Sequence, residues 1–239
     1  MLVGALAGQG AHLVVLPEKI AVPPSAELAR WQAHFAALAR THRLWLVVGV
    51  GEHGAHPRNL AWLFDPQGKP VLTSDKHILA PPERAQHYAT GTHYALQTIG
   101  DARSGLAICK DMLFAPLARA NGQCNAAMML VPAWDFGYHD AWTSAHMTVL
   151  RGVENGYVVV RNAREGWLIA SDAQGRVLLQ ADSAPMPGAS ALVSVPVGPQ
   201  RPTLSPRVGD LFGGLCVLAV LLVAAAYRRR ASAPLVAAR

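Results

Sequence analysis

The chain has 239 residues, of which 51% are hydrophobic and 15% are charged, so it can bury one large core and is not a disordered segment. Its formal net charge is +6, but the Lys and Arg residues are scattered and lack an aromatic–basic surface motif, which argues against nucleic-acid binding. Cys109, Cys124 and Cys216 are too widely spaced for a disulfide framework or a zinc site, so we expect neither a metal nor a cofactor.

The first part of the chain alternates between short apolar runs and stretches with a helical period. Residues 1–11 are typical of the end of a short amphipathic helix. Ser25 stands where it can cap a helix, because the apolar residues after it recur at helical spacing. Strands are expected over residues 12–16, 44–50, 60–64 and 71–74. A turn sequence over residues 65–68, Asp-Pro-Gln-Gly, predicts a tight reversal between the last two strands.

The same alternation continues through the second part of the chain. One helix is expected from about residue 141 to 154. Strands are expected over residues 106–108, 126–131, 157–160, 167–171, 177–179 and 191–195. Strands interleaved with helices in this way indicate an α/β protein with a layered core.

An uncharged, strongly apolar segment extends from Leu211 to Tyr227. Its 17 residues approach the roughly 20 that a membrane crossing needs, although a buried core helix is an alternative. Three arginines, residues 228–230, follow at once; the positive-inside rule keeps them in the cytoplasm and the preceding residues outside it. We therefore expect the following division: a globular domain over residues 1–200, a linker over 201–210, a transmembrane helix over 211–227 and a cytoplasmic tail over 228–239.

The N-terminus has no charged segment followed by an apolar one, so it does not match a signal peptide. A domain outside the cytoplasm needs a means of export. This combination predicts that the chain is truncated or begins at a late start site.

Three polar residues of complementary chemistry lie at the ends of predicted strands or just after them. They are Glu18, Lys76 and Cys109, and layered α/β proteins usually place their chemistry at such positions. A thiol needs a base to become a nucleophile, and a carboxylate can take its proton and later return it. An ammonium group and the backbone N–H of Lys110 can stabilise the negative charge of a tetrahedral intermediate.

Each of these residues also has a structural interpretation. Cys109 can be a small buried hydrophobic residue, Glu18 a helix cap or surface carboxylate, and Lys76 a solvated loop charge. Taken one at a time, these interpretations are the simpler ones, so the catalytic hypothesis depends on the three residues occurring together.

Four short segments of the chain occur in an order that points to a family. They are Val14–Glu18, Asp75–Pro81, Ala107–Asp111 and Arg151–Asn162. In these segments the chain resembles the nitrilase, or carbon-nitrogen hydrolase, superfamily, and within it the catalytic domain of the bacterial apolipoprotein N-acyltransferases. The resemblance implies an αββα sandwich, here without its first strand, and a catalytic triad of Glu18, Lys76 and Cys109.

The resemblance also implies supporting residues. The acyltransferases carry a further glutamate after the lysine, and Glu83 is the nearest equivalent; an exposed carboxylate paired with Arg84 is the alternative. Trp134 and Phe136 lie in a segment that is similar to the family's Trp-Phe-Gly loop, so they are expected to line a substrate pocket for the acyl chain. Ordinary core packing is the alternative for both.

The function implied by the resemblance is acyl transfer from a phospholipid to Cys109, and then from the thioester to an amine such as the N-terminus of a lipoprotein. It implies a location in the cell inner membrane, with a single C-terminal span and the catalytic domain in the periplasm or otherwise outside the cytoplasm. Hydrolysis of a small amide or a nitrile by the same residues is the alternative. The acyltransferases more often carry an aromatic residue and a glutamate where this chain has Lys110 and Asp111; this departure favours a third possibility, an inactive membrane-tethered remnant.

Overall fold

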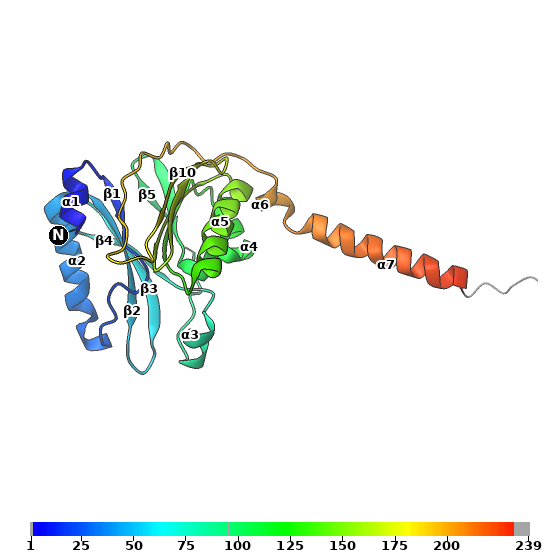
Figure 1. The fold of residues 1–239 in the computed structure, drawn as a ribbon, viewed down its shortest axis with the longest axis horizontal. Helices are drawn as coiled ribbons and strands as arrows, with labels where there is room; N and C mark the ends of the chain where they lie inside the picture. The colour runs from blue at the N-terminus through cyan, green and yellow to red at the C-terminus, as the bar shows by residue number, and fades with distance from the viewer. Residues whose placement is uncertain (1, 95, 232–239) are drawn as a thin grey trace, which may run out of the picture.

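The computed structural model describes residues 2–94 and 96–231, with side chains as far as residue 228. Two β-sheets pack face to face, and helices cover the outer face of each sheet (Figure 1). The outer helices are α1 (Leu2–Gly8) and α2 (Leu28–His42) on one side, and α4 (Ala115–Gln123) and α5 (Tyr138–Asn155) on the other. The expected αββα arrangement is confirmed.

The first sheet has four strands in the order β1-β2-β3-β4. They are β1 (Leu13–Val15), β2 (Trp45–Glu52), β3 (Arg58–Phe64) and β4 (Pro70–Asp75). The turn between β3 and β4 forms as predicted, because the Asp65 carboxylate accepts hydrogen bonds from the backbone N–H groups of Gln67 and Lys69. Gly68 has a φ of 78° in this turn, and a Cβ there would lie 2.4 Å from the carbonyl oxygen of Ala36.

The second sheet has six strands in the order β10-β9-β8-β7-β6-β5. They are β5 (Leu96–Ile99), β6 (Ala102–Leu106), β7 (Met128–Trp134), β8 (Val158–Arg164), β9 (Trp167–Ser171) and β10 (Val177–Asp182). Three neighbouring strands of this sheet, β6, β7 and β8, run parallel, so their carboxyl ends meet at one edge of the sandwich.

The alternation of side chains along the strands explains why both sheets are buried. In β2, Val47 points into the core between the sheets, where it meets Leu130 of β7. Its neighbours Leu46 and Val48 point the other way and pack against Phe35 of α2. Strands covered on both faces read as continuous apolar runs, which is the pattern that residues 44–50 show.

Three local expectations are wrong. Ser25 does not cap α2; it begins a 3₁₀ turn, Ser25–Glu27, and its hydroxyl donates to the carbonyl of His53 at 3.4 Å. The short apolar strand expected at residues 106–108 lies earlier, since β6 ends at Leu106. Residues 191–195 show the alternate burial of a strand, but they form no strand and pair with none among the described residues.

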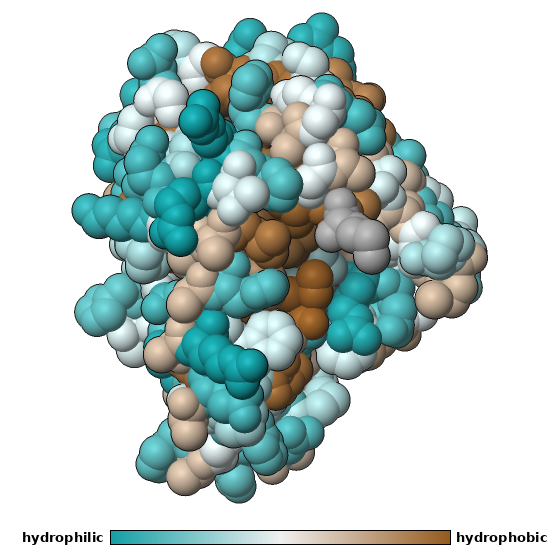
Figure 2. Space-filling model, turned by 90° about the vertical axis from the view of Figure 1, so that its left-hand side faces the viewer, coloured by the Kyte–Doolittle hydropathy of each residue, from teal (hydrophilic) through white to brown (hydrophobic). Residues whose placement is uncertain are grey.

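Residues 191–195 lie beside the outer edge of β1. A hollow of about 750 Å³ separates the elements here, and its lining includes Leu13, Val15, Val193 and Val195. Figure 2 shows apolar side chains in a hollow of the face that carries α1 and α2. The expectation of a missing strand stays a prediction.

The chain leaves the sandwich through α6 (Ser205–Val208) and α7 (Leu211–Ala231), and α7 projects away from the domain (Figure 1). The stretch expected as a linker thus contains a short helix, which is held to α4 by a hydrogen bond from the Gln123 side chain to the carbonyl of Pro206. In α7, the segment Leu211–Arg228 has a mean hydropathy of 2.1, is not buried against the rest of the protein and is long enough to span a membrane. The expected tail beyond residue 231 lies outside the described residues.

Candidate functional site

Glu18, Lys76 and Cys109 are delivered to the same end of the sandwich by three different elements. Glu18 follows β1, and its backbone N–H donates to the carbonyl of Ala133 at the end of β7, which ties the two sheets together there. Lys76 directly follows β4, and Cys109 begins the 3₁₀ helix η2 (Cys109–Leu113) after β6.

The side chains of Glu18 and Lys76 form a buried ion pair. Lys76 Nζ lies 2.7 Å from Glu18 Oε1. Both residues are buried, with 2% of Lys76 and 3% of Glu18 exposed to solvent. Burial alone would lower the pKa of the Lys76 ammonium, but the negative charges of Glu18 and Glu83, and of Cys109 when its thiol is ionised, outweigh burial and raise that pKa above its ordinary value. Lys76 is therefore a permanent cation at this site.

Glu83 is a second carboxylate of the same cluster and does not pair with Arg84. Its Oε2 lies 3.1 Å from Lys76 Nζ, and its Oε1 lies 2.7 Å from Lys19 Nζ. Burial would raise the pKa of Glu83, but the two lysines and the backbone N–H of Ala80 outweigh it and lower the pKa to about 2. The structure thus brings the expected supporting glutamate into contact with Lys76.

Asn59 connects the two carboxylates and was not anticipated from the sequence. Its Nδ2 donates to Glu18 Oε1 at 2.5 Å and to Glu83 Oε1 at 2.6 Å, and the residue is completely buried. Asn59 is the second residue of β3, after Arg58, and five apolar residues follow it; a polar side chain next to such a buried run is the sequence signal that could have indicated it.

Cys109 has a left-handed backbone and a thiol whose pKa is raised. Its φ is 46°, a left-handed conformation that costs a residue other than glycine about 1–3 kcal/mol and is common at functional sites. Its Sγ donates to the carbonyl of Trp134 at 3.4 Å. Burial and the charge of Glu18 raise the pKa of the thiol to about 12, although Lys76 and Arg161 oppose them. The thiol therefore needs a base at the moment it attacks.

Asp111 joins the loop that carries Lys76 to the turn that carries Cys109. Its carboxylate is fully buried and accepts backbone N–H bonds from His77 at 3.0 Å, Ile78 at 2.7 Å and Ile108 at 3.0 Å. Burial raises the pKa of Asp111 to about 7, and the hydrogen bonds only partly offset this effect. Asp111, which departs from the family pattern, thus holds the loop of Lys76 and the turn of Cys109 together.

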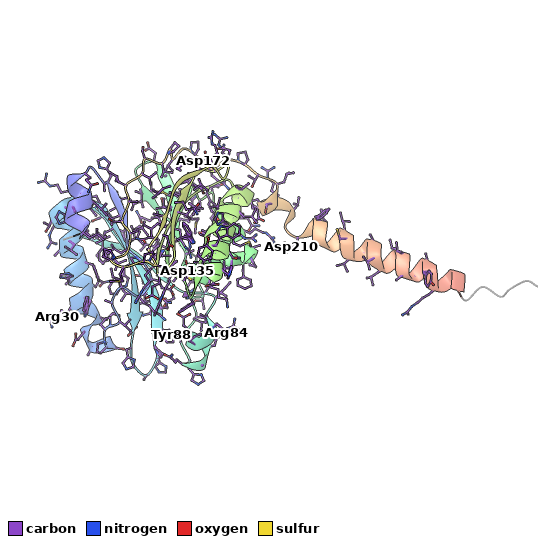
Figure 3. All side chains as sticks on the ribbon, in the orientation of Figure 1. Arg30, Arg84, Tyr88, Asp135, Asp172 and Asp210 are labelled. Atoms are coloured by element: carbon purple, nitrogen blue, oxygen red, sulfur yellow. The ribbon has the colours of Figure 1, made fainter. Side chains whose placement is uncertain are left out.

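A buried ion pair between Arg161 and Asp135 acts electrostatically on the thiol, because Arg161 lowers the pKa of Cys109. Arg161 Nη2 is 2.5 Å from Asp135 Oδ1, and neither side chain is exposed. Asp135 lies centrally in the domain, as Figure 3 shows. Burial raises the pKa of Asp135, and Arg161 only partly counters that rise. The carboxylate is therefore costly to bury without its partner.

Replacing Arg161 with methionine is expected to lower the free energy of unfolding by about 3–5 kcal/mol, because it leaves Asp135 buried and unpaired. Since the pKa of the unpaired carboxyl is higher in the folded state than in the unfolded state, the loss is larger at neutral than at acidic pH. Urea unfolding at both pH values measures it. Arg164→Met, on the same strand and 39% exposed, is the control and should cost far less; equal losses for both variants would contradict the assignment.

Of the remaining expected site residues, Trp134 and Lys110 adjoin Cys109, and Phe136 lies beside Trp134. Trp134 contacts the thiol through its carbonyl, and its ring lies 5.2 Å from that of Phe136, centroid to centroid. Phe136 is 63% exposed, so it is not part of the core. Lys110 follows Cys109 in the first turn of η2, where backbone N–H groups have no acceptor within the helix.

Most of the chain is similar in sequence to a known protein family. The sequence profile of the carbon-nitrogen hydrolase family matches residues 1–192. Apolipoprotein N-acyltransferase of Geobacter metallireducens is 27% identical, in an alignment that covers 95% of this chain and 48% of that protein. The chain therefore spans about half the length of this curated relative.

Solved structures with a similar fold include several of an amidase from Nesterenkonia sp. AN1. A variant of that amidase from the nitrilase superfamily superposes with a TM-score of 0.70 at 21% identity, over 75% of this chain and 78% of the amidase. A second variant, in complex with butyramide, superposes with a TM-score of 0.69 at 21% identity, over 76% and 78% of the two chains. In a third, the acetamide moiety of fluoroacetamide is attached at the active-site cysteine, with a TM-score of 0.69, 21% identity and the same coverage.

Proposed function

Because the chain belongs to the carbon-nitrogen hydrolase family, we propose that it is an acyltransferase that moves a fatty acyl group through a thioester on Cys109. The donor is a phospholipid, and the acceptor is an amine such as the N-terminus of a lipoprotein. The similarity to an N-acyltransferase over 95% of the chain supports acyl transfer, and the apolar helix α7 supports a donor in a membrane.

The observation that carries this proposal is that the two carboxylate oxygens of Glu18 have different hydrogen-bond partners. Its Oε1 is occupied by Lys76 and Asn59, whereas its Oε2 is buried and has no hydrogen-bond partner among the described residues. A carboxylate oxygen held in this way is suited to accept the proton of the Cys109 thiol, whose charge is coupled to that of Glu18.

In the proposed first half-reaction, Sγ of Cys109 attacks the ester carbonyl while the thiol proton moves to Glu18. The ammonium of Lys76 and the backbone N–H of Lys110 stabilise the negative charge on the carbonyl oxygen. The carbon–oxygen bond of the donor breaks, and its alkoxide leaves with the proton from Glu18 as lysophospholipid. Cys109 is then a thioester.

In the second half-reaction, Glu18 takes a proton from the attacking amine, and the nitrogen forms a bond to the thioester carbonyl. The carbon–sulfur bond breaks and Sγ recovers the proton from Glu18. The products are an amide and the free thiol.

The direct test is to incubate the full chain in vesicles with a phospholipid that carries a labelled acyl chain, and to look for hydroxylamine-sensitive label on the Cys109 peptide. Label on Cys109 and its transfer to a diacylglyceryl peptide are expected. Absence of label from Cys109 would contradict the proposed thioester.

Hydrolysis by the same residues is the second candidate. The fold similarity to an amidase, one variant of which is in complex with butyramide, favours it. If label leaves Cys109 equally fast with and without the acceptor peptide, water is the acceptor and the chain is a hydrolase.

We further propose that α7 crosses the inner membrane with residues 228–230 in the cytoplasm and the domain outside it. Introducing arginine at both Leu218 and Leu222, in the middle of α7, is expected to release the protein into the soluble fraction on alkaline extraction. Each charge at the centre of a span costs about 2.5–3.5 kcal/mol.

The matched control places the same two charges at the ends of the helix, by changing Leu211 and Tyr227 to arginine. This variant should stay in the membrane, because end positions allow arginine to reach the interface. Release of both variants, or of neither, would argue against a span.

A further inference from the structure

The buried cluster holds two carboxylates and two ammonium groups, and one ammonium has no part in the mechanism above. Glu18, Glu83, Lys76 and Lys19 carry charges that add to zero. Lys76 contacts both carboxylates, at 2.7 and 3.1 Å, whereas Lys19 contacts only Glu83. Without Lys19, the two carboxylates would share one cation, Lys76.

One amide nitrogen and one ammonium group join the two carboxylates. The same atom, Asn59 Nδ2, donates to Oε1 of Glu18 and to Oε1 of Glu83. Two carboxylates that share a site cannot both stay ionised unless enough positive charge faces them. When positive charge is lacking, the two carboxylates share one proton and titrate as a unit.

Lys19 is held firmly in its position. Its side chain is 11% exposed, its Nζ lies 4.4 Å from the centre of the Tyr88 ring, and its backbone has a φ of 49°. Figure 3 labels Tyr88 near the Arg84 end of α3 (Pro81–Ala85), the helix that carries Glu83. A left-handed backbone costs a lysine about 1–3 kcal/mol and persists only where surrounding contacts enforce it.

We propose that Lys19 is a positioning residue that keeps both carboxylates ionised, so that Glu83 holds Lys76 and Glu18 stays free to accept the thiol proton. This role rests on the proposed function of Glu18. Among the described residues, the charged or titratable groups that face the carboxylates are Lys19, Lys76 and Cys109. Lys76 also lowers the pKa of Asp111, and Arg161 lowers that of Cys109.

The test measures the ionisation of the site through the thiol itself. The full chain carries Cys124→Ser and Cys216→Ser, so that Cys109 is its only cysteine, and the rate of alkylation by iodoacetamide is followed against pH. Alkylation forms a carbon–sulfur bond, displaces iodide and passes the thiol proton to the base. The rate therefore falls at acidic pH as the base becomes protonated.

Lys19→Met is expected to move this acidic fall by about one pH unit or more toward neutral pH, because a proton now resides on the carboxylate pair. Below the shifted midpoint, alkylation should be about tenfold slower than in the parent. Lys19→Arg should keep the parent's profile. Lys69→Met removes an exposed lysine of the β3–β4 turn and is the control for net charge.

The double variant Lys19→Met with Glu83→Gln separates charge from packing. It restores the charge balance around Glu18 and should return the acidic fall toward the parent's position, although the contact with Tyr88 is still lost. A shift in Lys19→Met that Glu83→Gln does not reverse would overturn the proposal, as would no shift at all. If Lys19→Met does not fold, Lys19→Gln carries the same expectations.

These outcomes can be told apart from failure of the proposed function. A parent protein whose Cys109 shows an acidic fall in alkylation but forms no acyl-enzyme would end the acyltransferase proposal, and the assignment of Lys19 would stand or fall on its own variants.

Discussion

Changing Cys109 to alanine is expected to abolish the acyl-enzyme and to lower turnover by about 10⁴-fold or more, as loss of a covalent nucleophile does in other enzymes. Glu18, Lys76 and Glu83 keep their contacts in this variant, because none of them bonds to Sγ. The measurement is the rate of label transfer from a labelled phospholipid in vesicles.

The matched control for this variant is Cys124→Ala. Cys124 is exposed at the end of α4, and its loss should leave transfer unchanged. Equal turnover of Cys109→Ala and the parent would show that the thiol takes no part in the reaction.

Changing Glu18 to glutamine is expected to slow acyl-enzyme formation by about 10²–10⁴-fold. The amide keeps the size of the side chain and an oxygen that can accept from Lys76, but it cannot take the thiol proton. Because burial is the main reason that the thiol pKa is about 12, thiolate is scarce at neutral pH without the base.

The pH dependence of acyl-enzyme formation in Glu18→Gln tests the role of Glu18 as the base more directly than the rate at a single pH. The negative charge of Glu18 contributes to the high thiol pKa, so its removal lowers that pKa part of the way toward the ordinary value. The remaining rate should rise by about tenfold per pH unit up to the new pKa. A flat profile with the parent's rate would mean that another group is the base.

The sequence was most informative where one strand carries its own signal. Residues 44–50 and 60–64 read as buried strands because they are apolar on both faces, and β2 and β3 form there. The positions of Glu18 and Lys76 directly after strands were sufficient to suggest a common site, and the structure places them 2.7 Å apart.

Features that depend on a distant partner were missed. The role of Asn59 depends on two carboxylates that lie 41 and 24 residues away along the chain, and no local pattern indicates such a contact. The same holds for Lys19, whose partner is 64 residues distant. Residues 191–195 have the alternation of a strand, but alternation alone cannot supply the neighbour that a ladder needs.

The outer edge of β1 bears on how the protein behaves at high concentration. His12 and Leu16 bond to β2, so the alternating residues Leu13 and Val15 direct their backbone groups away from the first sheet. The Val15 carbonyl accepts a hydrogen bond from the Asn162 side chain of β8 at 2.5 Å. Natural proteins protect such edges with lysine, proline or a bulge, and the sequence Leu-Val-Val has none of these. Chains that meet at this edge can extend one sheet into the next, so the apolar hollow beside β1 adds a second aggregation hazard to that of the exposed apolar helix α7. The three-residue length of β1 and the contact of Asn162 with Val15 both limit this pairing.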